Sequence, residues 1–187
     1  MKAVLISIHP KWCEKIFNGE KTIEVRKTEP KLEAPFMVYV YMTKHKWLFK
    51  LLPFLKNRFS KVIGSFVCDR IVDIKSSGDD CGNYWHEWSD ECDIEDMCLS
   101  YEELETYLGK SVGYGWHISD LKIYDKPKEL REFSKFGYKY LGGCCVNYNC
   151  HNFIDNGWMQ PPECKIDGCF LTRAPQSWVY CETIDEK

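Results

Sequence analysis

The sequence predicts a mostly β, α+β fold: a mixed or antiparallel β-barrel with short helices on its rim and two loop-rich insertions, at about 76–99 and 137–169. Two observations support this class. Strand patterns recur along the whole chain, with a helix pattern after the first, and they leave few β-α-β crossovers for a doubly wound sheet. The chain also has 187 residues, no internal repeat and no low-complexity linker. We therefore expect one domain spanning 1–187.

The first half of the chain alternates strand and helix patterns. Residues 2–8 are largely apolar, which predicts a buried strand. Pro10 suits the first turn of a helix, and the apolar stripe that follows it stops at Gly19. Residues 21–26 alternate in polarity, and residues 36–43 are rich in β-branched and aromatic side chains, so we expect strands in both ranges.

Strands and short helices also alternate in the second half. In chain order we expect an amphipathic helix at 45–60, a strand at 62–74 with a bulge at Gly64, a helix at 100–109, a strand at 116–124, a helical turn at 127–133 and a strand at 171–182. The helix at 100–109 has the clearest start signal, because Ser100 and Glu103 form a capping-box pattern.

The net charge of −3 hides a strong asymmetry along the chain. Residues 1–61 hold 13 Lys or Arg against 5 Asp or Glu, a balance of +8, which leaves −11 for residues 62–187. Clustered basic residues create a local field, so the first third is expected to face an anionic partner. The acidic block at 76–105 is either a solvated surface or a docking site for a basic protein partner.

The sequence offers no candidate membrane span. Its longest apolar run, Trp47 to Leu55, is interrupted by Lys50 and Pro53 and is shorter than the roughly 20 residues that a spanning helix needs. The apolar stretch at the N-terminus is too short for a signal peptide. We therefore expect a cytoplasmic protein without a membrane partner.

One segment carries a cluster of charges suited to ligand binding. Lys21 and Arg26 offer a point charge and a planar fork that fit phosphate or the carbonyl oxygens of a base edge. Glu24 between them either holds both cations or accepts hydrogen bonds from an amine or a hydroxyl. A ligand-free ladder of surface ion pairs would use the same residues.

This segment resembles a known family. Residues 19–26, Gly-Glu-Lys-Thr-Ile-Glu-Val-Arg, match in full the G-x-K-x-x-E-x-R motif of ASCH domains, which have a PUA-like β-barrel fold. Residues 6–10 are similar to the family's first strand. Residues 116–118 and 175–178 resemble late strands of the branch found in phage and bacterial genomes.

The resemblance implies that a cleft beside the motif strand binds RNA, or a modified nucleoside or nucleotide. Aromatic side chains would stack on bases there, and Trp12 is one stacking candidate. The ligand-binding residues expected on this basis are His9, Lys21, Thr22, Glu24, Arg26, Trp116, Gln176, Ser177 and Trp178.

Catalysis in the same cleft is the alternative. One ASCH branch hydrolyses the amide of N4-acetylcytidine with a Lys, a Thr nucleophile and a Glu. This chain keeps the lysine as Lys21, but Glu24 stands at the nucleophile position and 62–74 contain no Glu, so that triad is not intact. A different arrangement remains open, with Lys21 as base and Ser177 or His117 from late strands, acting on an acylated nucleoside or an RNA phosphodiester.

Eleven cysteines are many for a chain of this length. The count is odd and no signal peptide is expected, which favours thiols or metal ligands over disulfides. Within 137–169, two cysteine pairs with four intervening residues each lie at the permissive edge of zinc spacing, and a bound zinc would order a loop rich in Gly and Pro. Free thiols are the alternative. The candidate ligands are Cys145, Cys150, Cys164 and Cys169, with Cys144 and His151 as substitutes.

Overall fold

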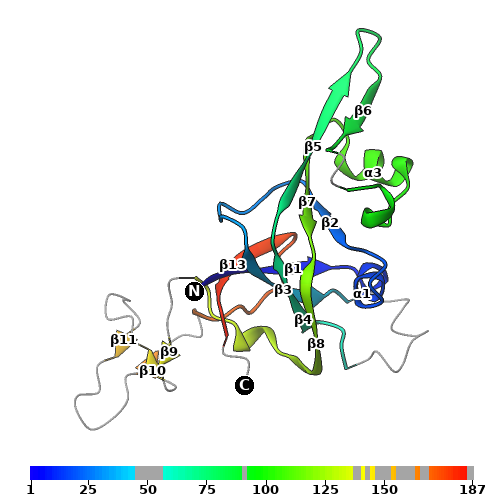
Figure 1. Cartoon of the computed structure of the whole chain (residues 1–187). Coiled ribbons are helices and arrows are strands. Elements are labelled where there is room, and N and C mark those ends of the chain that lie inside the picture. The colour runs from blue at the N-terminus through cyan, green and yellow to red at the C-terminus, as the bar shows by residue number, and fades with distance from the viewer. Residues whose placement is uncertain are drawn as a thin grey trace.

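A computed structural model gives the fold of the chain (Figure 1). The structure describes residues 1–44, 57–89, 92–136 and 169–184, together with the backbone of four two-residue strands between 140 and 164. Those strands are β9 (Tyr140–Leu141), β10 (Cys144–Cys145), β11 (Phe153–Ile154) and β12 (Glu163–Cys164). Most of the helix predicted at 45–60 lies outside the described residues, and 57–60 form a turn.

One sheet has five strands and joins the two ends of the chain. Its order is β13 (Trp178–Glu182), β1 (Lys2–Ile8), β3 (Phe36–Met42), β4 (Lys61–Cys68) and β8 (Ser119–Lys128). Strand β1 pairs in parallel with β3, and the other neighbours are antiparallel. The predicted bulge is confirmed, because the register of β4 against β8 shifts between Val62 and Gly64.

The second sheet has four antiparallel strands. Its order is β2 (Ile23–Arg26), β7 (Gly113–His117), β5 (Ile71–Gly78) and β6 (Tyr84–Glu87). The first half of β5 pairs with β7 and the second half with β6, so the β5–β6 hairpin projects beyond the sheet (Figure 1). The stretch 76–99, predicted as loop, therefore contains nearly all of this hairpin, including the whole of β6.

Two strands predicted as continuous are divided between the sheets. The strand predicted at 62–74 breaks after Cys68 and resumes at Ile71, and the one predicted at 116–124 breaks at Ile118. At these corners the His117 amide donates to the Arg70 carbonyl and the Ile118 amide to the Thr22 carbonyl. Apolar residues resume shortly after each corner, at Ile71 and at Leu121, so the pattern does not mark the break.

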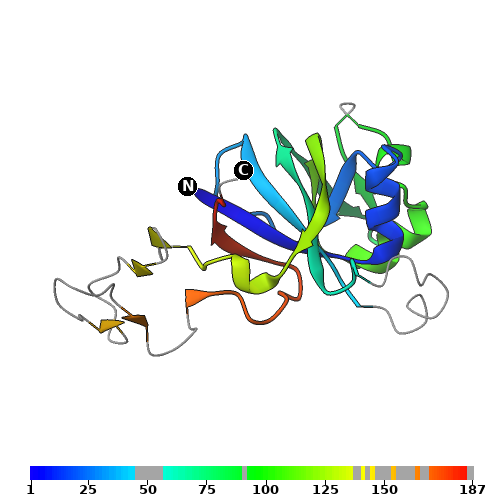
Figure 2. The same ribbon diagram turned by 90° about the horizontal axis from the view of Figure 1, so that it is seen from below.

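Short helices flank the sheets. Helix α1 (Pro10–Phe17) starts with the predicted proline, and Gly19 beyond its end adopts a φ of 74°. Helix α3 (Tyr101–Leu108) has the predicted capping box between Ser100 and Glu103. Two single 3-10 turns, η2 (Glu95–Met97) and η3 (Leu130–Glu132), complete the described helical elements. Figure 2 shows α1 and α3 at the same end of the molecule.

Separate apolar clusters hold each sheet to its helices. The largest packs α1 against both sheets, with Val4, Ile16 and Trp116 among its buried members. A smaller cluster packs α3 and η2 against the second sheet through Leu104 and Met97. This packing fixes α3 beside β2. The predicted mostly β, α+β class is confirmed, although the strands form two sheets that do not close into one barrel.

No helix in the described part of the chain is both long enough and apolar enough to cross a membrane.

Candidate ligand-binding cavity

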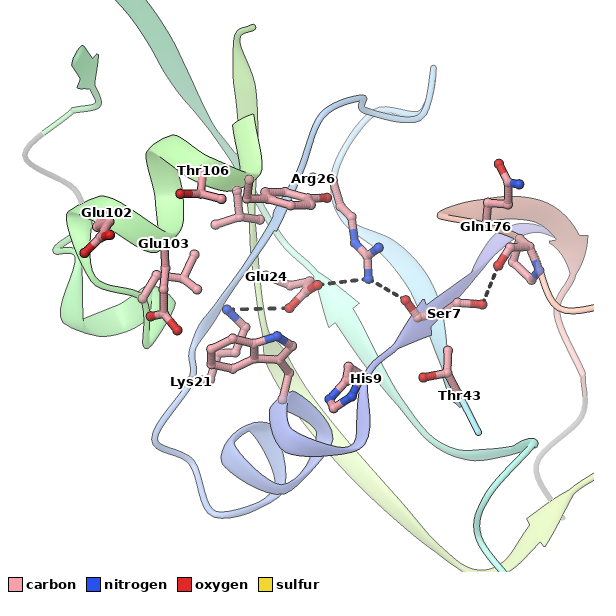
Figure 3. A pocket seen from close by; sticks show the side chains of 15 residues that line it. Ser7, His9, Lys21, Glu24, Arg26, Thr43, Glu102, Glu103, Thr106 and Gln176 are labelled. Atoms are coloured by element: carbon pink, nitrogen blue, oxygen red, sulfur yellow. Dashed lines mark hydrogen bonds and ion pairs between the residues drawn. The ribbon is translucent and has the colours of Figure 1, made fainter. Parts of the chain in front are cut away.

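A cavity of about 1070 Å³ lies over the motif strand, large for a small-molecule site. Strand β2 and Lys21, two residues before it, provide the floor, while β1, α1 and α3 provide the walls (Figure 3). The described residues that line it are Ser7, His9, Trp12, Lys21, Glu24, Val25, Arg26, Thr43, Leu99, Glu102, Glu103, Thr106, Tyr107, Pro175 and Gln176.

The three charged motif residues form one chain of polar contacts on the cavity floor. Lys21 Nζ lies 3.6 Å from Glu24 Oε2, and Arg26 Nη2 lies 2.9 Å from Glu24 Oε1. Arg26 Nη2 also donates to the Ser7 carbonyl at 2.7 Å, and Lys21 Nζ donates to the Met97 carbonyl. Glu24 therefore neutralises one of two buried cations, which leaves the floor with one positive charge.

Strand alternation alone would place Lys21 on the opposite face from Glu24. The strand begins only at Ile23, so Lys21 lies outside the regular alternation and its side chain turns toward Glu24. Thr22 instead turns toward η2, where its hydroxyl donates to Asp96 Oδ1 at 3.0 Å. The predicted contact residue Thr22 is thus absent from the lining of the cavity.

Burial makes these charges costly unless they are paired. Lys21, Glu24 and Arg26 are 3%, 5% and 7% exposed, and buried ions lose hydration that only close partners replace. Burial lowers the pKa of Lys21, and the negative charge of Glu24 acts against that shift. Arg26 Nε is buried with no hydrogen-bond partner among the described residues, so the floor keeps an unsatisfied donor.

Helix α1 provides an aromatic wall. The Trp12 ring centroid lies 5.2 Å from Lys21 Nζ and 4.2 Å from Lys11 Nζ. His9 stands at the start of this helix, where its Nδ1 accepts from the Lys11 amide at 3.2 Å. The predicted residues His9, Lys21, Glu24, Arg26 and Gln176 all line the cavity, as does the stacking candidate Trp12.

Helix α3 provides the adjoining wall, which the sequence did not reveal. Glu102, Glu103, Thr106 and Tyr107 line the cavity from this helix. Burial raises the pKa of Tyr107, while the charge of Arg26 and a hydrogen bond from it act in the other direction. The capping box located the helix, but only its packing against β2 shows that its polar side faces the motif.

Two predicted stacking residues lie outside this lining. Trp116 is 0% exposed and belongs to the core between the sheets, with its ring 5.8 Å from Phe36 and 6.1 Å from Trp178. Trp178 packs on Tyr180, and its indole N–H donates to the Thr28 hydroxyl. Both indoles are therefore held by packing, as is common for Trp in strands.

The two predicted catalytic partners are likewise separated from Lys21. Ser177 lies beside β1 and accepts from the Ser7 amide through its backbone carbonyl. His117 ends β7 and pairs through Nδ1 with Asp69 Oδ1 at 2.6 Å. Neither residue lines the cavity, so the structure does not assemble Lys21 with Ser177 or His117.

The predicted zinc ligands are only partly described. Cys150 and His151 lie outside the described residues, and only the backbone is described at Cys144, Cys145 and Cys164. Cys169 is buried. Among the side chains that are described, no three His, Cys, Asp or Glu come together as a metal site.

Crystal structures of one ASCH protein and its mutants are similar to part of the chain. The crystal structure of ASCH from Zymomonas mobilis is 18% identical, with a TM-score of 0.46 over 68% of this chain and 73% of that one. Crystal structures of two mutants of the same protein are also similar. One is 18% identical, with a TM-score of 0.48 over 70% of this chain and 77% of that one. The other is 19% identical, with a TM-score of 0.46 over 68% of this chain and 74% of that one. The chain is similar in structure to ASCH proteins. No protein-family profile and no curated protein sequence matches it.

Proposed function

We propose that this chain is an ASCH domain and that its cavity binds a nucleoside-like ligand, either free as a modified nucleoside or exposed in RNA. The observation that carries the proposal is the buried Lys21–Glu24–Arg26 chain on the floor of a large cavity. A site whose charged residues are held rigidly by one another is preorganised for a planar polar ligand.

The chemistry of the floor suits a base edge. The guanidinium of Arg26 and the ammonium of Lys21 donate hydrogen bonds, as carbonyl oxygens of a base require, and Glu24 accepts them from an exocyclic amine. Trp12 from α1 and Tyr107 from α3 add aromatic surface, and base stacking on such surface tolerates any base.

Calorimetric titration of the four common nucleosides, N4-acetylcytidine and a single-stranded RNA oligonucleotide tests the proposal. Lys21→Met and Arg26→Lys are expected to weaken binding at least tenfold while the proteins stay folded by circular dichroism. Lys15→Met is the matched control, because Lys15 pairs with Glu20 at 2.9 Å and does not line the cavity. Equal affinity in all four proteins would contradict the proposal.

Hydrolysis in the same cavity is a second candidate, favoured by the lowered pKa of Lys21 beside Glu24. Lys21 in its neutral form would take a proton from water as the water oxygen attacks the acyl carbon, and that proton would then go to the departing amine. Glu24 holds the position of the Thr nucleophile in the acetylcytidine hydrolases. Incubation with N4-acetylcytidine and with single-stranded RNA, followed by chromatography, tests this candidate, and release of cytidine or shorter RNA that disappears in Lys21→Met supports it.

A protein partner is a third candidate, favoured by the projecting β5–β6 hairpin. Its turn carries exposed Asp79 and Asp80, and Asp79 is held by hydrogen bonds from the Asn83 amide and side chain. We propose that a basic protein docks on this acidic end. Asp80→Lys is expected to abolish an interaction recovered by affinity purification, and an unchanged set of recovered proteins would remove this candidate.

We also propose a structural zinc in the cysteine-rich segment. Strands β10 and β12 lie side by side, so that at least one of Cys144 and Cys145 has its Cα within 8 Å of the Cα of Cys164. Two short hairpins with so few residues need a further link to be stable. Metal analysis of the purified protein tests this, and less than a tenth of an equivalent of zinc without chelator exposure rejects the site.

A further inference from the structure

The walls of the cavity carry a charge opposite to that of its floor. Lys21 and Arg26 are the only cations among the described lining residues other than His9, and they share Glu24. Across the cavity, helix α3 adds Glu102 and Glu103, whose side chains are labelled in Figure 3. With His9 neutral, the described lining therefore has a net charge of −1 despite the basic first third of the chain.

The two carboxylates on α3 differ in what they contact. Glu103 caps its own helix by accepting from the Ser100 amide at 3.0 Å, and it also pairs with Lys11 Nζ at 3.4 Å. Glu102 is exposed and its carboxylate has no partner among the described residues. Glu102 is thus the one described wall carboxylate left open to a ligand.

This arrangement has a clear consequence for ligand charge. The floor attracts an acceptor or a single negative charge, whereas the α3 wall attracts donors and repels anions. A phosphate that approached α3 would meet the unpaired carboxylate of Glu102, because the two described lysines beside this wall, Lys11 and Lys27, already lie against Glu103 and the Tyr107 ring. Repulsion between like charges at a protein surface remains substantial over several ångströms. Hydroxyl or amino groups at the same place would donate to the carboxylate.

We infer that Glu102 is a specificity-determining residue, which accepts hydrogen bonds from an unphosphorylated nucleoside and discriminates against nucleotides with phosphate near α3. The inference rests on the proposed function, since it specifies which form of the ligand enters the cavity. The unsatisfied Arg26 Nε on the buried floor is an independent sign that this cavity accommodates a ligand.

The experiment compares each of four nucleosides (adenosine, guanosine, cytidine and uridine) with its 5′-monophosphate by calorimetric titration. In the unmodified protein, the best nucleoside is expected to bind about tenfold more tightly than its monophosphate, the size of effect expected for one pair of like charges near a surface. Glu102→Gln is expected to reduce this ratio several-fold, and Glu102→Lys to reverse it. Glu105→Lys changes the same charge on the same helix away from the lining and is expected to leave the ratio unchanged.

Salt provides a second readout that a merely structural role of Glu102 would not affect. The nucleoside-to-nucleotide ratio is expected to fall as ionic strength rises from about 0.05 to about 0.5 M, because exposed charges are screened. A monophosphate that binds as tightly as its nucleoside, or a ratio that Glu102→Lys leaves unchanged, overturns the inference alone. No binding of the four nucleosides, of their monophosphates, of N4-acetylcytidine or of the RNA oligonucleotide overturns it together with the proposed function.

Discussion

Glu24 and Arg26 stand two residues apart on strand β2 and form a buried ion pair of 2.9 Å, with Lys21 on the other side of the same carboxylate. Because Glu24 is the only acidic residue in this chain of contacts, the two cations depend on it for compensation. Two further properties of the floor follow from this dependence: its contribution to stability and its response to pH.

Glu24→Gln is expected to destabilise the protein by about 3–5 kcal/mol, the usual cost of leaving a buried charge without its partner. Urea unfolding monitored by circular dichroism measures the change. Glu20→Gln serves as the comparison, because its ion pair with Lys15 is largely exposed and solvent screening leaves such a pair little effect on stability. Similar losses in the two variants would show that Glu24 does not compensate a buried charge.

Lys21 is expected to make stability rise with pH on the alkaline side. Burial lowers the pKa of Lys21 below its usual 10.5, so between the folded and unfolded pKa values the unfolded chain binds more protons and stability increases with pH. Thermal unfolding from pH 7 to 10 is expected to show the unmodified protein gaining stability relative to Lys21→Met as pH rises toward 10.5.

Lys15 supplies the opposite sign for comparison. Its hydrogen bond to Glu20 raises the pKa of Lys15, so its contribution is present below 10.5 and lost only at higher pH. Lys15→Met is therefore expected to show no gain of the unmodified protein over the variant between pH 7 and 10. If the unmodified protein gained stability over Lys15→Met as pH rises, or gained none over Lys21→Met, the opposite pKa shifts assigned to these two lysines would be contradicted.

Substitution of Trp12 is expected to affect ligand binding, whereas substitution of Trp116 is expected to affect the stability of the fold. Trp116→Ala removes a completely buried ring and is expected to cost about 3–5 kcal/mol of unfolding free energy. Trp12→Ala is expected to cost less stability and to weaken nucleoside binding by about 1–3 kcal/mol, the range for a stacked base. Urea unfolding and calorimetric titration of both variants test these two expectations. Unchanged nucleoside binding in Trp12→Ala would show that the ligand does not stack on Trp12.

The capping box is expected to control the α3 wall. Ser100→Ala leaves the Glu103 amide without its side-chain acceptor, which typically costs about 1 kcal/mol. Faster hydrogen exchange confined to the first turn of α3 is expected, together with weaker nucleoside binding. Ser111→Ala, just beyond this helix, is the control, because its hydroxyl caps no described helix. Equal hydrogen-exchange rates in the two variants would show that the Ser100 cap does not stabilise α3.

The described thiols are expected to differ widely in reactivity. Burial raises the pKa of Cys68 and of Cys181 to about 12, so neither forms the reactive thiolate at pH 8. Cys81 is exposed in the β5–β6 turn. Brief alkylation followed by peptide mass spectrometry is expected to label Cys81 before Cys68 and Cys181, and early labelling of Cys68 or Cys181 would show that the core is open.

Much of the local structure was predictable from sequence because its signals are local. The proline and glycine that bound α1 and the Ser100–Glu103 capping box specify hydrogen bonding within a few residues, and the apolar run at 2–8 specifies a strand through its own composition. The motif at 19–26 likewise pointed to Lys21, Glu24 and Arg26, and all three line the cavity.

Tertiary structure decided what local signals could not. The sequence pattern of a strand is the same whether the strand remains in one sheet or crosses to another, so the corners at Cys68–Ile71 and at Ile118 could not be predicted. Trp116 and Trp12 were equal candidates for stacking, and only packing against Phe36 and Trp178 assigned Trp116 to the core. The basic balance of the first third indicated an anionic ligand, yet Glu102 and Glu103 reach the cavity from a helix far along the chain. The sum of charges around a site depends on which distant segments fold against it, and sequence position does not contain that information.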